Sequence, residues 1–534
     1  MAWTHDYIPL GNLWLSALAA AVPFLLLCWQ LLIRRAKGYI AALTALAGAA
    51  LLAVLVWDMP SITALSAGAY GLAFGAFPIL WIILSAMWMY TMTVDAGQFA
   101  IVRDSISNLT EDRRIQAVFI AFSFGALLES TAGMGSPVAI GAAMLIGLGF
   151  PPIMAAVMCL VANTVPVAYA GMGLPAVVAA QVAELDAFRV SQIIGSQLPV
   201  LAFFVPFWMC VILCGWRRSL EVWPVLLAGG LGSAIPTFLF AWFHGYTLPG
   251  IMGAIGSMGA IAVVLRFWKP ERIFLFAGEE GAAAARMRLS GAEVLRAWMP
   301  WIVMTVLVVF SSVGPVRAAL NSLQFSRIDW PGLHEMVFKA PPLTALPEAM
   351  SAQFTFNFLS CAGTSIFFTG LLLPLIMPHY SYARAFAALW KICVQMRFSV
   401  ATVLLILALA QIMNYSGMSY TLGLAFTHTG SLFPLFSPVL GWFGVFLTGS
   451  DTSSNALFGG MQRTTAEAVG MDPHLAVAAN TTGGVTAKMI SPQSVAVAVG
   501  ATGMTGQEGT LLRRTIGHSL LMLAAVSLLT WVLR

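Results

Sequence analysis

Two carboxylates stand alone in long apolar stretches of the chain. Glu129, in "FGALLESTAGMGSPVAIG", is the only charged residue between Arg114 and Glu184, and Asp451, in "VFLTGSDTSSNALFG", is similarly isolated downstream of Arg397. A carboxylate that has lost its hydration binds a proton more readily, so such a group can take up and release a proton inside a membrane. The two acids are therefore candidate proton-coupling residues. A structural role, paired with a helix N-terminus or a hydroxyl, is the alternative.

Three further ionisable residues lie in apolar surroundings. Lys488 is the only cation of its stretch and is a candidate ligand for an anionic substrate. Its alternatives are an ion pair with one of the two acids and an ammonium group that reaches to the membrane interface. His428 and His518 are candidate proton relays, and hydrogen-bonded structural histidines are their alternative.

A polar motif occurs twice. "VANTVPVAYAGMGLP" (Val161–Pro175) and "AANTTGGVTAKMISP" (Ala478–Pro492) share A-N-T and then Ala, Met and Pro at the same offsets. The order carboxylate then A-N-T is the same in both halves, which indicates an internal repeat. We expect Asn163–Thr164 and Asn480–Thr481 to lie at helix breaks and to contact substrate.

The segments around the two acids are rich in Gly, Ser, Thr, Asn and Pro. These residues weaken a helix or compete for its hydrogen bonds. Irregular backbone at membrane depth is tolerated only inside protein or beside a watered cavity, and a helix N-terminus there attracts carboxylates. The pattern predicts re-entrant hairpins and broken helices around a central site, to which Ser453 and Ser454 would contribute.

The composition is that of a membrane protein. The 534 residues are 60% hydrophobic and 9% charged, with a mean hydropathy of +0.88, whereas soluble domains carry about 25% charged residues. Apolar runs of membrane-spanning length predict an all-α polytopic protein of about 12 to 14 transmembrane segments. The cations lie mostly in connections, so the net charge of +5 does not indicate a nucleic-acid partner. Neither a cofactor nor a metal site is predicted.

The charges in the connections predict that the two repeats are inverted. The connection after Gly97 contains three arginines, whereas the matching connection after Gly417 contains no Lys or Arg. Basic connections face the cytoplasm, so the two repeats have opposite orientations, as in many secondary transporters. Basic residues follow the first apolar segment rather than precede it, which places the N-terminus outside. The predicted parts are N-terminal helices 1–61, repeat 62–214, central linking helices 215–381 and repeat 382–534.

Other function classes fit less well. A channel would carry rings of charge or a carbonyl filter, and the sequence shows no such filter. An enzyme is not expected, because no GxSxG or HExxH frame stands in a suitable context. No Walker A sequence is present. The residues favour an ion-coupled carrier of a small anion.

Several motifs resemble one family. "YIPLGNLWLSALAAAVPF", "FGALLESTAGMGSPVAI", "NYSGMS", "FSPVLGWFGVFLTGSDTSSNALFG" and "AANTTGGVTAKMISPQS" together resemble the bacterial L-lactate permease family from end to end. The resemblance implies a multi-pass inner-membrane symporter that imports L-lactate, and often D-lactate and glycolate, with a proton. It also implies a transport domain that moves against a scaffold, within a homodimer. Ser130, Met134 and Ser136 depart from the family's usual Gly, Phe and Ala, so lactate is not the only substrate to consider.

Together these features predict a mechanism. The substrate carboxylate meets helix N-termini and Lys488, and its hydroxyl meets Asn163, Asn480 or Ser and Thr groups, while Glu129 or Asp451 takes the proton. The alternative is a sodium-coupled carrier of another small carboxylate, because unwound carbonyls and hydroxyls also suit Na⁺.

Overall fold

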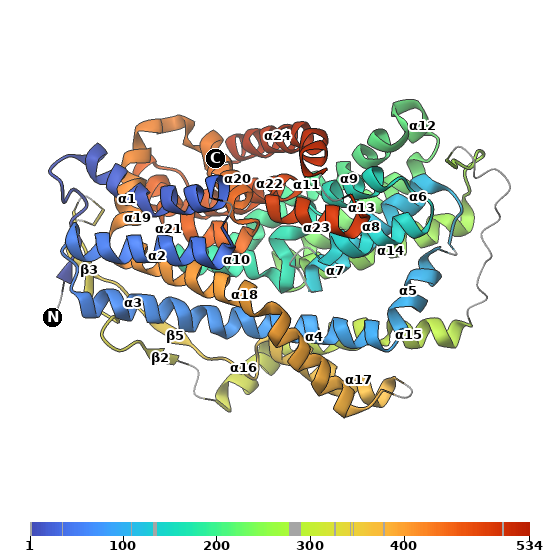
Figure 1. Ribbon diagram of the computed structural model, residues 1–534, viewed down its shortest axis with the longest axis horizontal. Coiled ribbons are helices and arrows are strands. Elements are labelled where there is room, and N and C mark those ends of the chain that lie inside the picture. The colour runs from blue at the N-terminus through green and yellow to red at the C-terminus, as the bar shows by residue number, and fades with distance from the viewer. Residues whose placement is uncertain are drawn as a thin grey trace.

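The computed structural model describes residues 3–34, 36–107, 109–131, 136–276, 290–324, 327–341, 343–344, 346–377, 380–504 and 507–534. Helices fill the molecule and run mostly along its long axis (Figure 1). Eleven helices in the described ranges are long and apolar enough to cross a membrane, and three shorter apolar helices accompany them. The predicted all-α polytopic fold is confirmed.

Two helices precede the first predicted repeat. The Asn12 side chain begins the first of them by accepting hydrogen bonds from the backbone N–H groups of Trp14 and Leu15, which supplies partners for donors that a helix start leaves free. The helices are α1 (Leu13–Cys28), continued by a π-helical segment (Trp29–Ile33), and α2 (Gly38–Leu55).

The first predicted repeat contains two interrupted helices. Its elements are α3 (Ser61–Phe74), a π-helical segment (Gly75–Leu80), α4 (Trp81–Asp95), α5 (Gln98–Ser107), α6 (Arg113–Ala117), a π-helical segment (Val118–Phe124), α7 (Gly125–Thr131), α8 (Ser136–Gly147), α9 (Pro152–Ala162), a 3₁₀ segment (Val165–Tyr169), α10 (Ala170–Val182) and α11 (Ala187–Cys214). Helices α7 and α8 form the first hairpin, and Met134 in its tip lies outside the described residues.

The central part combines helices with short strands. Its elements are α12 (Trp216–Leu220), α13 (Trp223–Phe243), α14 (Pro249–Phe267), α15 (Gly291–Ser312), α16 (Gly314–Ser322), β2 (Arg327–Asp329), β3 (Val337–Lys339), β4 (Glu348–Ala349), β5 (Gln353–Thr355) and α17 (Ala362–Ile376).

The second predicted repeat follows a similar order of elements. It consists of α18 (Tyr382–Tyr415), α19 (Met418–Phe426), a 3₁₀ segment (Thr427–Leu432), α20 (Phe433–Thr448), α21 (Asp451–Val469), α22 (Pro473–Ala487), a 3₁₀ segment (Lys488–Ile490), α23 (Pro492–Thr502) and α24 (Glu508–Val532). Helices α20 and α21 form the second hairpin, which turns at Gly449 and Ser450.

Short strands cover one end of the molecule, which we call the sheet end. Strand β1 (Trp3–Thr4) pairs in parallel with β3, β3 pairs antiparallel with β4, and β2 pairs antiparallel with β5. The N-terminal strand therefore joins the central part of the chain to form a cap. His5 anchors this cap through a 3.0 Å contact between its Nε2 and the Tyr415 carbonyl. Burial lowers the pKa of His5 to about 4, so this ring is neutral at pH 7.

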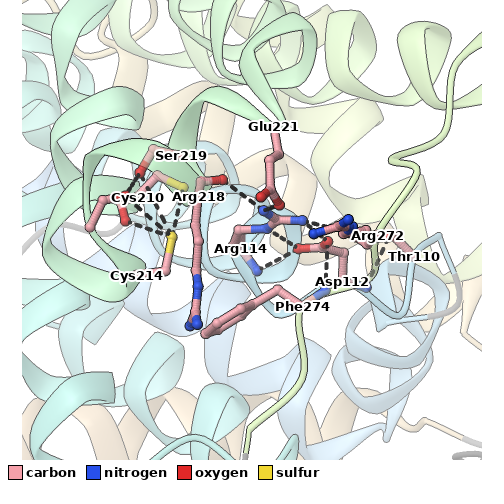
Figure 2. A network of polar contacts seen from close by, with 11 residues as sticks. Thr110, Asp112, Arg114, Cys210, Cys214, Arg218, Ser219, Glu221, Arg272 and Phe274 are labelled. Carbon is pink, nitrogen blue, oxygen red and sulfur yellow. Dashed lines mark hydrogen bonds and ion pairs between the residues drawn. The ribbon is translucent and has the colours of Figure 1, made fainter.

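A buried arginine organises the opposite end, which we call the α12 end (Figure 2). Arg114 forms a 2.6 Å ion pair with Asp112 and a 2.7 Å ion pair with Glu221. It also donates to the backbone carbonyls of Arg218 and Arg272. A buried charge is tolerated only when it is paired in this way. The network fixes the start of the first hairpin to α12 and to the connection after α14.

The two predicted repeats run in opposite directions between these ends. Helix α3 begins at the cap, where Ser66 donates to the Pro331 carbonyl, and α11 ends beside α12. Helix α18 instead ends at the cap, next to His5. Helix α24 then runs back toward the sheet end, since Arg534 donates to the Ser431 carbonyl and neighbouring His428 contacts Trp14. Opposite directions are what inverted-topology repeats require; the repeat boundaries stay a prediction.

Close helix packing holds the second hairpin in place. Gly441 of α20 lies against the Asn480 backbone of α22, and Gly483 of α22 lies against the Pro438 backbone of α20. A side chain at either position would overlap the facing backbone. Small residues at such contacts let helices approach closely, which is the main source of helix association in a membrane.

We expect Gly441→Ala to destabilise the protein by about 3 kcal/mol, because its new methyl group must push α22 away. Thermal unfolding of the purified protein in detergent measures the effect. Gly517→Ala in α24 is the matched control, since a methyl group there meets open space. Equal unfolding temperatures for the two variants would contradict this account of the packing.

Candidate functional site

A cavity of about 1060 Å³ lies between segments of both predicted repeats. Exposed Lys37 and Glu508 line its mouth, at the ends of α2 and α24 remote from the sheet. The polar side chains lining the cavity include those of Glu129, Thr448, Ser450, Asp451, Thr452, Ser453, Lys488 and Gln493. Apolar lining is contributed by residues including Val167, Leu174, Pro175, Phe446, Ile490 and Val495.

Asp451 is the first residue of α21 and reaches the cavity from the second hairpin. Its side chain is 2% exposed, and neither carboxyl oxygen has a hydrogen-bond partner among the described residues. The preceding Ser450 caps the helix by accepting from the Ser453 N–H at 3.2 Å. A free N–H group at a helix start favours an anion. The predicted position of Asp451 at a helix break beside a cavity is observed.

Lys488 reaches the same region from the break between α22 and α23. It is 5% exposed, and its ammonium group donates a 2.6 Å hydrogen bond to the Gly449 carbonyl. Its charge interacts electrostatically with both Glu129 and Asp451, but neither acid is hydrogen-bonded to it in the described structure. The cation is thus held on a backbone carbonyl, and its charge interacts with both carboxylates.

Glu129, near the end of α7, approaches the cavity from the first hairpin. It is 1% exposed, and one of its carboxyl oxygens has no hydrogen-bond partner among the described residues. Asn163 lies next to it, at the C-terminal end of α9. The Asn163 amide, the Thr164 hydroxyl and the Ser130 hydroxyl are all buried without hydrogen-bond partners in the described structure.

These unpaired groups are concentrated at three helix ends, namely the ends of α7 and α9 and the start of α21. Half of the unpartnered buried polar side-chain atoms found in the described ranges belong to Glu129, Ser130, Asn163, Thr164 and Asp451. An unpaired buried polar atom costs about 1–3 kcal/mol, and native proteins carry few of them. Their concentration here indicates a place for a polar ligand or for water.

The break between α9 and α10 also carries backbone strain. Gly171, Met172 and Gly173 have φ angles of 51°, 62° and 80°. The left-handed region is costly for a residue with a side chain, so Met172 is strained, and such strain is concentrated at functional sites. Gly171 lines the cavity, so the strained turn forms part of its wall.

The second A-N-T motif does not lie at a break, and here the expectation from sequence is wrong. Asn480 and Thr481 lie inside α22, which continues to Ala487 and breaks only at Lys488. Asn480 donates to Asn455 Oδ1 at 2.8 Å and accepts from Gln462 at 3.0 Å, and Thr481 also donates to Asn455 Oδ1. These bonds join α21 to α22. In the second half, the A-N-T motif therefore stabilises helix packing.

The remaining predicted residues are divided between the cavity and its surroundings. Ser453 lines the cavity, whereas Ser454 donates to the Gly441 carbonyl between α20 and α21. His428 contacts the Ala425 carbonyl at the sheet end, and His518 accepts a hydrogen bond from Trp208. Neither histidine lines the cavity.

Sequence reasoning missed two residues that shape the site. Gln493 lines the cavity and packs against Gly449 at the tip of the second hairpin. Asn455 carries the network between α21 and α22 and also donates to the Pro175 carbonyl of α10 at 3.1 Å. The position of Gln493, directly after the Ser-Pro pair that ends the second polar motif, was the available signal for it.

The two asparagines of the repeated motif should respond differently to truncation. We expect Asn480→Ala to lower the free energy of unfolding by about 2 kcal/mol, because it removes bonds to Asn455 and Gln462. Within the described structure the Asn163 amide has no hydrogen bond of good geometry, so Asn163→Ala should be much less destabilising than Asn480→Ala. Thermal unfolding of the two purified variants in detergent measures this difference. Equal destabilisation by Asn480→Ala and Asn163→Ala would show that Asn163 is also structural.

Comparison with known proteins identifies relatives along the whole chain. The family model described as L-lactate permease matches residues 16–534. The chain is 42% identical to "Glycolate permease GlcA" of Escherichia coli K12, over 99% of this chain and 98% of that protein. It is also 42% identical to the "L-lactate permease" of Bacillus subtilis 168, over 100% of this chain and 98% of that protein.

Two solved transporter structures show a distant likeness. The YdaH transporter of Alcanivorax borkumensis is 16% identical with a TM-score of 0.45 and covers 86% of each chain. MtrF of Neisseria gonorrhoeae is 13% identical with a TM-score of 0.48, over 90% of this chain and 85% of that one.

The family model and the named relatives confirm the resemblance of the sequence motifs. The relatives are permeases rather than enzymes, in agreement with the expected class. This multi-pass membrane protein belongs to the L-lactate permease family.

Proposed function

We propose that this protein imports lactate, glycolate or related small 2-hydroxy carboxylates across the bacterial inner membrane together with a proton. The names of its relatives support the substrate class. The observation that carries the proposal is the buried Lys488, which lines the same cavity as the buried carboxylates of Glu129 and Asp451 and interacts electrostatically with both.

The charges of this group explain why a proton would accompany the anion. With Glu129 and Asp451 both ionised, Lys488 leaves the region with one net negative charge, which repels a carboxylate. Protonation of one acid removes that charge, and the ammonium group is then free to attract the substrate. Binding of the anion and of the proton therefore favour each other, and such coupling is reciprocal.

Each group has a role in this proposal. The substrate carboxylate draws Lys488 away from the Gly449 carbonyl and also meets the N–H groups at the start of α21. Ser453 and Gln493 are placed to bond the substrate hydroxyl, since both line the cavity. Asn163 lies beside Glu129 and its amide can bond either protonation state of the acid. Asn480 and Thr481 hold the helices that position Asp451.

Charge distribution supports an orientation. Most cations of the described chain lie away from the cap, and basic residues next to spans favour the cytoplasmic side. They include Arg34, Lys37, Arg113, Arg114, Arg217, Arg218, Arg266, Lys269, Arg272, Arg296, Arg384, Lys391, Arg397, Arg513 and Arg514. We place the cap and the N-terminus in the periplasm, so that the cavity opens toward the cytoplasm.

Uptake of labelled L-lactate into membrane vesicles tests the coupling. Wild-type vesicles should accumulate lactate under an inward proton gradient without sodium. Asp451→Asn should reduce this accumulation by about tenfold or more, because an amide cannot exchange a proton. Lactate exchange between the two sides should be better preserved, since the amide resembles the protonated acid. Glu129→Gln, tested in parallel, identifies which acid carries the proton.

Uptake driven by a sodium gradient alone would overturn proton symport and favour Na⁺ binding at Asp451 and the nearby hydroxyls. Transport of another carboxylate without lactate or glycolate uptake would overturn the substrate class and leave the fold and family unchanged.

Lys488 should determine affinity for the anion. We expect Lys488→Gln to raise the KM for lactate by about tenfold or more, because a charge-assisted bond to the substrate carboxylate is lost. Lys488→Arg retains the charge and should recover part of the affinity. Initial uptake rates across a range of lactate concentrations measure this effect. An unchanged KM in Lys488→Gln would exclude contact between this cation and the substrate.

A further inference from the structure

The two helices that border the cavity also meet at the sheet end. Helix α10 begins at the strained cavity wall and ends near Glu184, and α21 begins at Asp451 and carries Arg463 farther along. At their cavity ends, Asn455 of α21 donates to the Pro175 carbonyl of α10. The region around Glu184 therefore lies at the opposite ends of the helices that form the site.

One carboxylate oxygen joins three separate parts of the chain there. Glu184 Oε2 accepts from Lys339 of strand β3 at 2.6 Å and from Arg463 of α21 at 3.1 Å. Lys339 is 12% exposed and Arg463 is 24% exposed, so both pairs are partly shielded from water. Glu184 also adopts a φ of 53°, which is costly for a residue with a side chain.

The two cations are held differently. Arg463 also donates to the Ala183 carbonyl at 2.9 Å and pairs with Glu467 at 2.7 Å, so it is bound to α10 and to its own helix by several contacts. Lys339 belongs to the cap, and its other charge contact is the face of the Tyr420 ring, 5.7 Å from the ring centre. Glu184 is thus the point at which the cap is fastened to the α10–α21 pair.

We propose that Glu184 is the latch of a gate at the sheet end, which closes when Lys339 binds to it. The cavity opens remote from the sheet in this structure, so the latched cap belongs to the state that is closed at the sheet end. Exposing the site to that side requires Lys339 to leave Glu184. Arg463 stays with α10, because α21 is bonded to α10 near both ends. Asn455 donates to the Pro175 carbonyl at one end, and Arg463 donates to the Ala183 carbonyl at the other.

This inference rests on the proposed function only in assuming that the site must face both sides of the membrane in turn. It assigns positioning roles to Glu184 and Lys339, and neither of them lines the cavity.

Accessibility of the cavity from each side tests the latch. A cysteine is introduced by Thr452→Cys in a variant without the six native cysteines, and an impermeant maleimide is added to sealed vesicles of each orientation. From the sheet side, labelling should be slow with the latch intact and about fivefold faster after Lys339→Gln or Glu184→Gln, because losing a partly shielded ion pair shifts the population toward the open state. Glu335→Gln is the matched control, because this acid of the cap lies against His334 rather than Lys339; it should leave labelling unchanged.

A second arm closes the gate permanently. Glu184→Cys with Lys339→Cys, joined by a short bifunctional thiol reagent, should abolish labelling from the sheet side, and a reducing agent that cleaves the linker should restore it. Unchanged labelling in both latch variants, Lys339→Gln and Glu184→Gln, or an equal increase in Glu335→Gln, would overturn the proposal. The assay contains no substrate and no ion gradient, so its result is independent of whether the transported species is lactate and the coupled ion a proton.

Discussion

The structure depends on one electrostatic constraint, which is that three ionisable side chains are almost fully buried in the wall of one cavity. Lys488 can remain in this region because a backbone carbonyl accepts its hydrogen bond and two carboxylates lie within its field. A lone ammonium group would not be tolerated at such burial. Each of these groups lies at or near a helix end beside the cavity. The unpaired backbone groups at such an end must be covered by neighbouring helices, because lipid cannot bond them.

That shelter comes from two kinds of packing. Glycine contacts such as Gly441 with Asn480 bring α20 of the second hairpin directly against the backbone of α22. Buried polar networks fix the approach of the hairpins, with Arg114 and Asp112 at the α12 end and Asn455 between α21 and α22. At the break in the first half, the side chains of Asn163 and Thr164 have no hydrogen-bond partners in the described part of the chain, so their polar atoms are free to bind a ligand.

The sequence predicted the class of fold, the two hairpins and a common site for Glu129, Asp451 and Lys488. Isolated charged residues in apolar segments are expected to face the interior of the helix bundle or a water-filled cavity, where these three are found. It could not predict the different fates of the two A-N-T motifs. Asn163 ends a helix and Asn480 does not, and the difference arises from contacts with Asn455 and Gln462, which local sequence does not encode. The sequence also could not predict the cap, because β1 pairs with β3, which lies more than 300 residues farther along the chain.

The size of the cavity has a consequence for the energetics of transport. At about 30 Å³ for each water molecule, a volume of about 1060 Å³ holds on the order of 30 waters. Under the proposed function, a small hydroxy acid remains hydrated on entering the cavity and loses its water only on binding at the wall. Closing the mouth must return most of this water to the side that the cavity faces. The rate of that step would then depend on water activity, as expected for any step that empties a hydrated cavity of this size.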